Sequence, residues 1–365
     1  MMFQSALTQL PAAVRLFGLE DADQLQVGSA SRIAAQHHPP LNPDIPALLA
    51  VDDAVDAAAL RRALLNQYPG DHPLRLARLA ESQVVDLVLD ALDGAALAGP
   101  DVMLYVPPRA LPSSFERFQE TIAHLRAPEG CPWDRKQTHA SLRPYLLEET
   151  YEVLDALDTG DVAALREELG DLLLQIVLHS QIAVDEGEFR MADVIATINE
   201  KIIRRHPHVW GSTEVNDEQD VKVNWDRLKQ AEKNHQGKSR LDGVPRSLPA
   251  LVQSHSYQDR AARVGFDWDS MEPVIAKVHE ELAEALAAED PDARAGEIGD
   301  LLFAVVNLAR WLDVEPESAL RGANARFYRR FEYIEQQAAA QGRDLDEMTL
   351  ADMDALWDDA KANGL

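Results

Sequence analysis

The chain has 365 residues, of which 62 are acidic and 35 are basic, and its formal net charge is −27. This length predicts two or three domains. The negative charge argues against binding to nucleic-acid backbones or anionic membranes, because both require clustered Lys and Arg. Cys131 is the only cysteine, which excludes an internal disulfide and a thiolate metal cluster. With no long apolar run and no secretory signal pattern, we expect a cytoplasmic protein without nucleic-acid or membrane partners.

Residues 1–110 predict a short α/β segment. Residues 57–66 have a helical pattern, whereas residues 73–79 and 102–106 resemble strands, and Pro and Gly separate these runs. No glycine-rich loop follows a strand, so this segment offers no nucleotide-binding loop. We expect a boundary at residues 109–112 and a helical chain from there onward.

End signals mark the helices that follow. Ser114 is expected to cap a helix that stops at residues 130–134, and Pro144 suits the first turn of the next helix. Residues 191–205 form an amphipathic pattern that ends at a proline. The polar residues 234–240 are expected to form a linker.

Two carboxylate pairs stand at helical spacing on either side of a predicted turn at residues 158–161. Glu149 and Glu152 are three residues apart, as are Glu168 and Asp171, so each pair shares a helix face. The short turn makes the two helices antiparallel neighbours and brings the pairs together. The second helix is strongly apolar, so we expect it to be buried. Carboxylates there need a counter-charge, and Mg²⁺, with Mn²⁺ as a substitute, is the predicted cation.

The acidic and histidine motifs also allow other interpretations. An isolated ExxE pair is more often a solvated helix face. His206 and His208 flank a proline at a helix end, where capping or surface roles are expected. The only ExxH motif, residues 232–235, lies in a polar stretch, and this disfavours a di-iron centre inside a helical bundle.

The second half of the chain repeats the first. Glu281 and Glu284 repeat the first carboxylate pair, and Glu297 and Asp300 repeat the second, across a turn at residues 289–292. The flanking segments recur in the same order, namely residues 132–134 as 267–269, residues 199–205 as 324–330, and the W-x-x-x-K motif at 225–229 as 357–361. We interpret this pattern as a tandem duplication.

Several repeated cations and tryptophans could contact a nucleotide. They are Lys201, Arg205, Trp225 and Lys229 in the first half, and Arg326, Arg330, Trp357 and Lys361 in the second. Basic side chains one helical turn apart can meet phosphate together, and a tryptophan can stack on a base. The alternatives are a solvated helix face for the cations and core packing for the tryptophans.

These motifs resemble the MazG family of nucleoside triphosphate pyrophosphohydrolases. The resemblance spans about residues 113–365 and rests on residues 130–134, 147–153, 168–173 and 204–209 together with the second copy. It implies a mainly α fold in which two tandem all-α NTP pyrophosphatase modules, residues 111–235 and 236–365, follow the short α/β segment, and it implies a homodimer.

The resemblance also implies an activity. Mg²⁺ held by Glu149, Glu152, Glu168 and Asp171, and by Glu281, Glu284, Glu297 and Asp300, would support attack of water on nucleoside triphosphates and release a monophosphate and pyrophosphate. The eight repeated cations and tryptophans would contact the nucleotide. Lys201 is exchanged for Arg326 between the copies, so the two sites need not be equally active.

Residues 1–110 resemble, more weakly, the C-terminal part of a tetrapyrrole methylase domain without its glycine-rich half, so no methyltransferase activity is expected. The alternative functions are a narrower pyrophosphatase for dUTP, dCTP or a modified nucleotide, and a helical scaffold with vestigial carboxylates.

Overall fold

The structure is a computed structural model, and it describes residues 2–99, 101–215, 217, 220–221, 224–225, 228 and 239–365, with side chains from residue 9 onward. The chain divides into two compact units. The first is Met1–Leu146 with Leu173–Met191, and the second is Leu147–Leu172 with Ala192–Leu365. The predicted three-part domain division stays a prediction, and its boundary at residues 235 and 236 falls outside the described residues.

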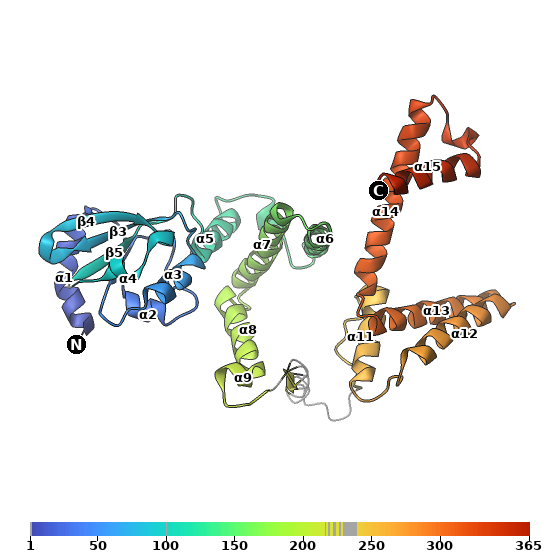
Figure 1. Ribbon diagram of the computed structural model, residues 1–365, viewed down its shortest axis with the longest axis horizontal. Coiled ribbons are helices and arrows are strands. Elements are labelled where there is room, and N and C mark those ends of the chain that lie inside the picture. Colours follow the sequence, from blue (N-terminus) through green and yellow to red (C-terminus); the bar gives the residue numbers. More distant parts are fainter. Residues whose placement is uncertain are drawn as a thin grey trace. The chain divides into compact units, whose positions relative to one another are not determined.

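The first unit begins with a five-stranded sheet (Figure 1). The strands are β1 (Gln26–Ser29), β2 (Ala47–Ala50), β3 (Pro73–Arg78), β4 (Gln83–Val88) and β5 (Val102–Val106), in the order β1-β2-β5-β3-β4. β1 pairs with β2 in parallel, and the other pairs are antiparallel. The strand-like runs at residues 73–79 and 102–106 are therefore confirmed as β3 and β5.

Helices cover both faces of this sheet because alternate strand residues point to opposite sides. Leu48 and Met103 pack with α1 (Met2–Phe17), whereas Leu49 and Leu104 pack in the core that contains the other helices. Those helices are α2 (Ala30–Ala34), α3 (Ala57–Leu65) and α4 (Gly94–Leu97). The predicted helix at residues 57–66 is confirmed as α3, and so is the α/β character of the segment.

A third core in the first unit lies under α5 (Phe115–Arg126). The Ser114 hydroxyl oxygen accepts a hydrogen bond from the Arg117 backbone N–H at 3.1 Å, which confirms the predicted N-cap. Ile122 of α5 packs with Leu142 and with Leu178 and Ile182 of α7 (Val162–Glu186). This core anchors the C-terminal half of α7.

The second unit is helical in its described residues. It contains most of α6 (Arg143–Thr159), the start of α7, and then α8 (Met191–Arg205), α9 (Pro207–Trp210), α11 (Ala250–Ala262), α12 (Met271–Ala287), α13 (Pro291–Trp311), α14 (Pro316–Ala340) and α15 (Leu350–Ala362). α12 and α13 form an antiparallel hairpin, and α15 folds back on α14 (Figure 1). The predicted helix at residues 191–205 is confirmed as α8, and the mainly α fold class is confirmed. No helix among the described residues is both long and apolar enough to cross a membrane.

The turn between α6 and α7 depends on one glycine. Gly160 has φ +70°, its N–H bonds the Leu157 carbonyl, and the Asp161 N–H bonds the Ala156 carbonyl at 3.1 Å. This is a Schellman C-cap, for which a left-handed residue is required. The Asp161 carboxylate then caps α7 through the backbone N–H groups of residues 163 and 164. Consecutive caps thus fix the predicted turn at residues 158–161.

Alanine substitutions at two glycines of this hairpin should have opposite effects on stability. Gly160→Ala should lower the free energy of unfolding by about 1 kcal/mol, because it forces a side chain into the left-handed region. Gly170→Ala, inside α7 where an added Cβ meets no atom within 4 Å, should raise it by about 0.5–1 kcal/mol. Urea unfolding followed by circular dichroism measures both, and equal signs would contradict the assigned turn.

Candidate functional site

The α6–α7 hairpin brings together the first carboxylate set, Glu149, Glu152, Glu168 and Asp171. One carboxylate oxygen from each of the three glutamates lies within 4.8 Å of the others. Desolvation by the helices, followed by repulsion from Glu152 and Asp171, raises the pKa of Glu168 above its ordinary value. Glu168 therefore lies close to Glu149 and Glu152, and Glu152 and Asp171 repel its charge.

The α12–α13 hairpin brings together the second carboxylate set, Glu281, Glu284, Glu297 and Asp300. Oxygens of Glu281, Glu297 and Asp300 lie within 4.8 Å of one another, and Glu284 groups with Glu281 in the same way. Desolvation, and then repulsion from Glu284, Glu281 and Asp300, raises the pKa of Glu297. The two hairpins thus bring corresponding acids together, but the close group around Glu168 includes Glu152, whereas the close group around Glu297 includes Asp300.

A cation that the sequence reasoning missed lies at the second set. The Lys277 Nζ atom is 2.5 Å from Glu281 Oε1 and 2.8 Å from Glu280 Oε1. Glu281 is only 5% exposed, so this ion pair compensates a buried charge. The i, i+4 spacing from Lys277 to Glu281 could have revealed it. Tyr145 occupies the matching place before Glu149, so the first set lacks this lysine.

The donor atoms of both sets fit a hard divalent cation. Mg²⁺ and Mn²⁺ prefer carboxylate oxygens, and Mg²⁺ at about 2.1 Å from each ligand requires ligand oxygens about 3 to 4 Å apart. The clustered oxygens are within 4.8 Å of one another, so small side-chain rotations suffice. At the second set the Lys277 ammonium already supplies positive charge to the buried carboxylate. The identity of the metal and the role of each ligand stay predictions.

Part of α7 departs from the expectation that it is buried. Val177 and Leu178 are buried, but Leu169, Leu173 and Ile176 in the acidic half of the helix are exposed. The sequence pattern identifies apolar residues, but it does not show which other residues pack against them. A two-helix hairpin can bury only the faces that meet, and its outer apolar faces stay open.

The predicted nucleotide contacts form two similar clusters apart from the hairpins. The Arg205 guanidinium lies over the Trp225 ring at 5.3 Å, and the Arg330 guanidinium lies over the Trp357 ring at 5.4 Å. Lys361 pairs with Asp358 at 3.0 Å. The remaining predicted contacts are Lys201, half-buried on α8, Arg326, exposed on α14, and Lys229, which lies outside the described residues.

His206 has a structural role, as expected from its position at a helix end. Its Nδ1 donates to the Ile202 carbonyl at 2.7 Å, and its ring contacts Trp210 and Trp225. The ExxH motif at residues 232–235 lies outside the described residues.

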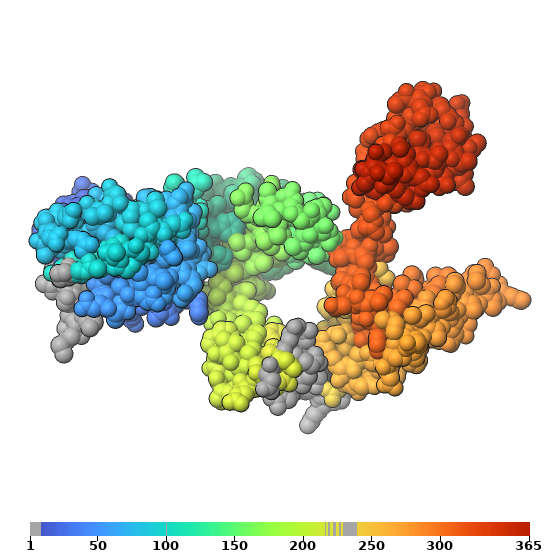
Figure 2. All heavy atoms as spheres, viewed as in Figure 1, coloured from blue at the N-terminus to red at the C-terminus, as the bar shows by residue number. Residues whose placement is uncertain are grey.

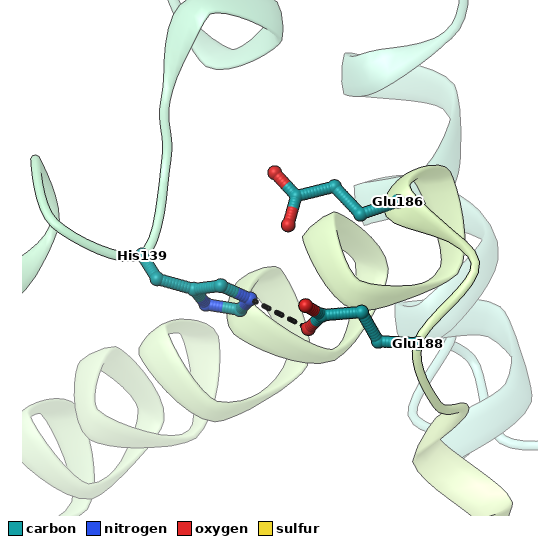
Figure 3. A group of neighbouring side chains, drawn as sticks. All are labelled: His139, Glu186 and Glu188. Atoms are coloured by element: carbon teal, nitrogen blue, oxygen red, sulfur yellow. Dashed lines mark ion pairs between the residues drawn. The ribbon is translucent and has the colours of Figure 1, made fainter.

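Another His and Glu group occurs at the end of α7. His139 Nε2 lies 3.7 Å from Glu188 Oε2, with Glu186 beside them (Figure 3). The His139 and His179 rings stack, and their Nδ1 atoms share a hydrogen bond of 2.7 Å. An ion pair and this imidazole contact account for the arrangement, and both glutamates are exposed.

Comparison with known proteins identifies the family to which these hairpins correspond. The model of the MazG nucleotide pyrophosphohydrolase domain matches residues 137–210 and 266–334. These segments contain both carboxylate sets, and they end before Trp225 and before Trp357.

Curated relatives match over longer stretches. The MazG nucleoside triphosphate pyrophosphohydrolase/pyrophosphatase of Thermotoga maritima is 45% identical over 247 residues, covering 68% of this chain and 95% of that protein. The nucleoside triphosphate pyrophosphohydrolase of Escherichia coli K12 is 44% identical over 256 residues, 68% of this chain and 97% of that protein. An uncharacterized Bacillus subtilis protein, YabN, is 42% identical over 323 residues, which are 85% of this chain and 66% of YabN.

Proposed function

Because the chain belongs to the MazG nucleotide pyrophosphohydrolase family, we propose that it hydrolyses nucleoside triphosphates to the monophosphate and pyrophosphate. The observation that carries the proposal is the pair of carboxylate sets, each formed by four acids on two adjacent helices. Such a set holds the cation that phosphate chemistry requires.

Mg²⁺, or Mn²⁺ in its place, is the proposed cofactor of each set. When bound, this ion would neutralise phosphate charge and lower the pKa of a coordinated water. Glu149, Glu152, Glu168 and Asp171, and their counterparts in the second set, would hold it. One carboxylate of each set would orient or deprotonate the attacking water.

The basic clusters would meet the rest of the substrate. We assign the Arg205 and Arg330 guanidinium groups, which lie over tryptophan rings, to the substrate phosphates. Lys201 and Arg326 would add positive charge from the same helices, and Lys277 would screen the second carboxylate set against substrate phosphates. We assign the same supporting role to Trp225, Lys229, Trp357 and Lys361.

Two tandem modules that assemble as a homodimer would explain the open apolar faces. Leu286 is 80% exposed and Leu302 is 54% exposed on the α12–α13 hairpin, whose tip protrudes in Figure 2. A second hairpin would cover such faces and complete a four-helix bundle. We place this enzyme in the cytoplasm and propose no nucleic-acid partner, because the net charge of −27 opposes one.

Product analysis tests the activity directly. The purified chain is incubated with each NTP and dNTP, with Mg²⁺ or with EDTA, and the phosphorylated products are separated. Monophosphate and pyrophosphate should appear only with the metal, and a single favoured nucleotide would indicate the narrower pyrophosphatase. Diphosphate and phosphate, or no product at all, would refute the proposal, and the second result would favour the scaffold.

Substitutions in the carboxylate sets should lower turnover without unfolding the chain. Glu152→Gln and Glu284→Gln should each remove the part of the turnover that one carboxylate set contributes. The double variant should lose at least about 100-fold in kcat/KM, because each set loses a metal ligand. Glu186→Gln, at the exposed end of α7, is the control and should keep full activity. Steady-state kinetics with matched circular dichroism spectra measure the effect, and full turnover in the double variant would disprove the assignment.

The dimer should depend on the exposed apolar residues of the second hairpin. Leu286→Glu and Leu302→Glu should convert a dimer to a monomer, because a charge would be buried in the interface. Leu111→Glu, at an exposed position between β5 and α5, should have no effect. Light scattering after gel filtration gives the mass, and a monomeric unsubstituted chain would rule out this assembly.

A further inference from the structure

A cavity of about 560 Å³ adjoins the second carboxylate set. Glu281, Asp300 and Lys277 form part of its wall, and the aromatic side chains of Tyr257, Phe266, Trp268 and Phe303 form another part. Small-molecule sites have volumes of roughly 300–1,000 Å³ and combine apolar walls with a few polar groups. The cavity therefore provides space for an organic group directly beside the acids.

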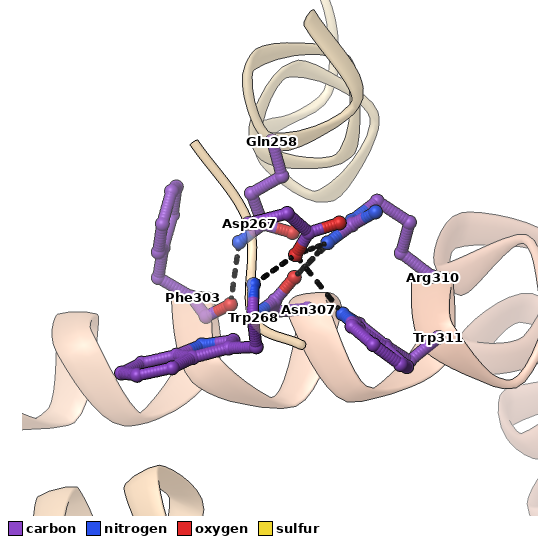
Figure 4. Close-up of polar contacts among 7 residues, drawn as sticks. All are labelled: Gln258, Asp267, Trp268, Phe303, Asn307, Arg310 and Trp311. Atoms are coloured by element: carbon purple, nitrogen blue, oxygen red, sulfur yellow. Dashed lines mark hydrogen bonds and ion pairs between the residues drawn. The ribbon is translucent and has the colours of Figure 1, made fainter. Parts of the chain in front are cut away.

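Three aromatic rings in this wall are open to solvent. Phe266 is 83% exposed, Trp268 is 46% exposed and Phe303 is 44% exposed. Figure 4 shows the rings of Trp268 and Phe303 at α13, both on the left of the view. Flat apolar surfaces of this kind are suited to stacking with a nucleobase.

The residues that hold these rings are fixed by hydrogen bonds (Figure 4). Asp267 Oδ1 accepts from Arg310 Nη2 at 2.6 Å, from Trp311 Nε1 at 3.1 Å and from the Trp268 backbone N–H at 2.9 Å. Burial alone would raise the pKa of Asp267, but these bonds hold it below its ordinary value, so the carboxylate stays charged. Gln258 Nε2 donates to the Phe303 carbonyl at 2.8 Å and ties α11 to α13.

Asn307 lines the cavity with a defined orientation. Its Oδ1 accepts from Arg310 Nε at 3.2 Å and from Nη2 at 2.9 Å. A guanidinium can only donate, so the amide oxygen must face Arg310. A molecule in the cavity could therefore receive a hydrogen bond from the Asn307 NH₂ group, which requires a hydrogen-bond acceptor on that molecule.

The first half of the chain lacks this polar lining. In the register that aligns Glu297 with Glu168, Phe303 corresponds to Leu174 and Asn307 corresponds to Leu178, which is buried in a core. Trp133, the counterpart of Trp268, packs edge-to-face against Tyr145 with ring centroids 5.9 Å apart. The polar cavity wall is thus a property of the second half.

We propose that this cavity binds the nucleoside part of the substrate, with the base stacked on Trp268 beside Phe303 and a base carbonyl accepting a hydrogen bond from Asn307. The O6 atom of guanine and the O4 atom of uracil or thymine meet this requirement. Adenine and cytosine carry amino groups, which are donors, at the same positions.

The inference rests on the proposed function, because it places the triphosphate at the second carboxylate set. In this inference the base stacks on Trp268 and not on Trp357, whose ring contacts Phe327 and Arg330.

Kinetics on the full chain test the base preference. With saturating Mg²⁺, kcat/KM for GTP, UTP, ATP and CTP is measured in the full chain carrying Glu152→Gln, in which only the second carboxylate set is intact. Trp268→Ala should lower all four values about tenfold through KM, because the stacking surface is lost. Asn307→Asp should lower GTP and UTP about fivefold relative to ATP and CTP, because a carboxylate accepts and cannot donate. Trp133→Ala is the matched control and should leave the ranking unchanged.

Binding separates this inference from the proposed activity. Calorimetry with α,β-methylene GTP and α,β-methylene ATP, which cannot be cleaved between the α and β phosphates, reports affinity without turnover. Weakened binding in Trp268→Ala supports the cavity even if no nucleotide is hydrolysed. Normal hydrolysis with unchanged KM and base ranking in Trp268→Ala and Asn307→Asp overturns the inference and leaves the activity standing. A change of oligomeric mass in Trp268→Ala would also overturn it, because a second chain would then cover the cavity.

Discussion

Repulsion among four carboxylates on two adjacent helices is the constraint on which the proposed site depends. Backbone hydrogen bonds and helix caps hold the hairpins in place, so the acids cannot simply move apart. The raised pKa values of Glu168 and Glu297 indicate that this arrangement costs electrostatic free energy when the carboxylates are charged. A divalent cation removes that cost, and the site is therefore suited to bringing a metal and a negatively charged substrate together.

The two carboxylate sets share this constraint but differ in their surroundings. Lys277 pairs with a buried acid of the second set, whereas the first set has Tyr145 at the matching place. The second set also adjoins the cavity with Asn307 and Trp268 in its wall. Both sets have the same four acids at corresponding positions, whereas the neighbouring residues differ, so we regard the second set as the better equipped to select a base.

The same hairpins connect the site with assembly. Two helices bury only the surfaces that meet, and apolar residues such as Leu173 and Leu302 remain exposed on the outer faces. Covering them would also remove water from the neighbourhood of the acids, where electrostatic interactions would become stronger. Dimer formation and metal binding are therefore expected to support each other.

The sequence by itself determined the features that depend on local spacing. The helix at residues 191–205, the strands β3 and β5, the Ser114 cap and the shared faces of the carboxylate pairs all follow from patterns a few residues long. Only the tertiary structure decided which apolar residues are covered, and it alone brought Asp267 to Arg310 and Trp268 to the cavity beside Glu281. Those relations join residues far apart in the chain, and no local period encodes them because they depend on how the helices pack.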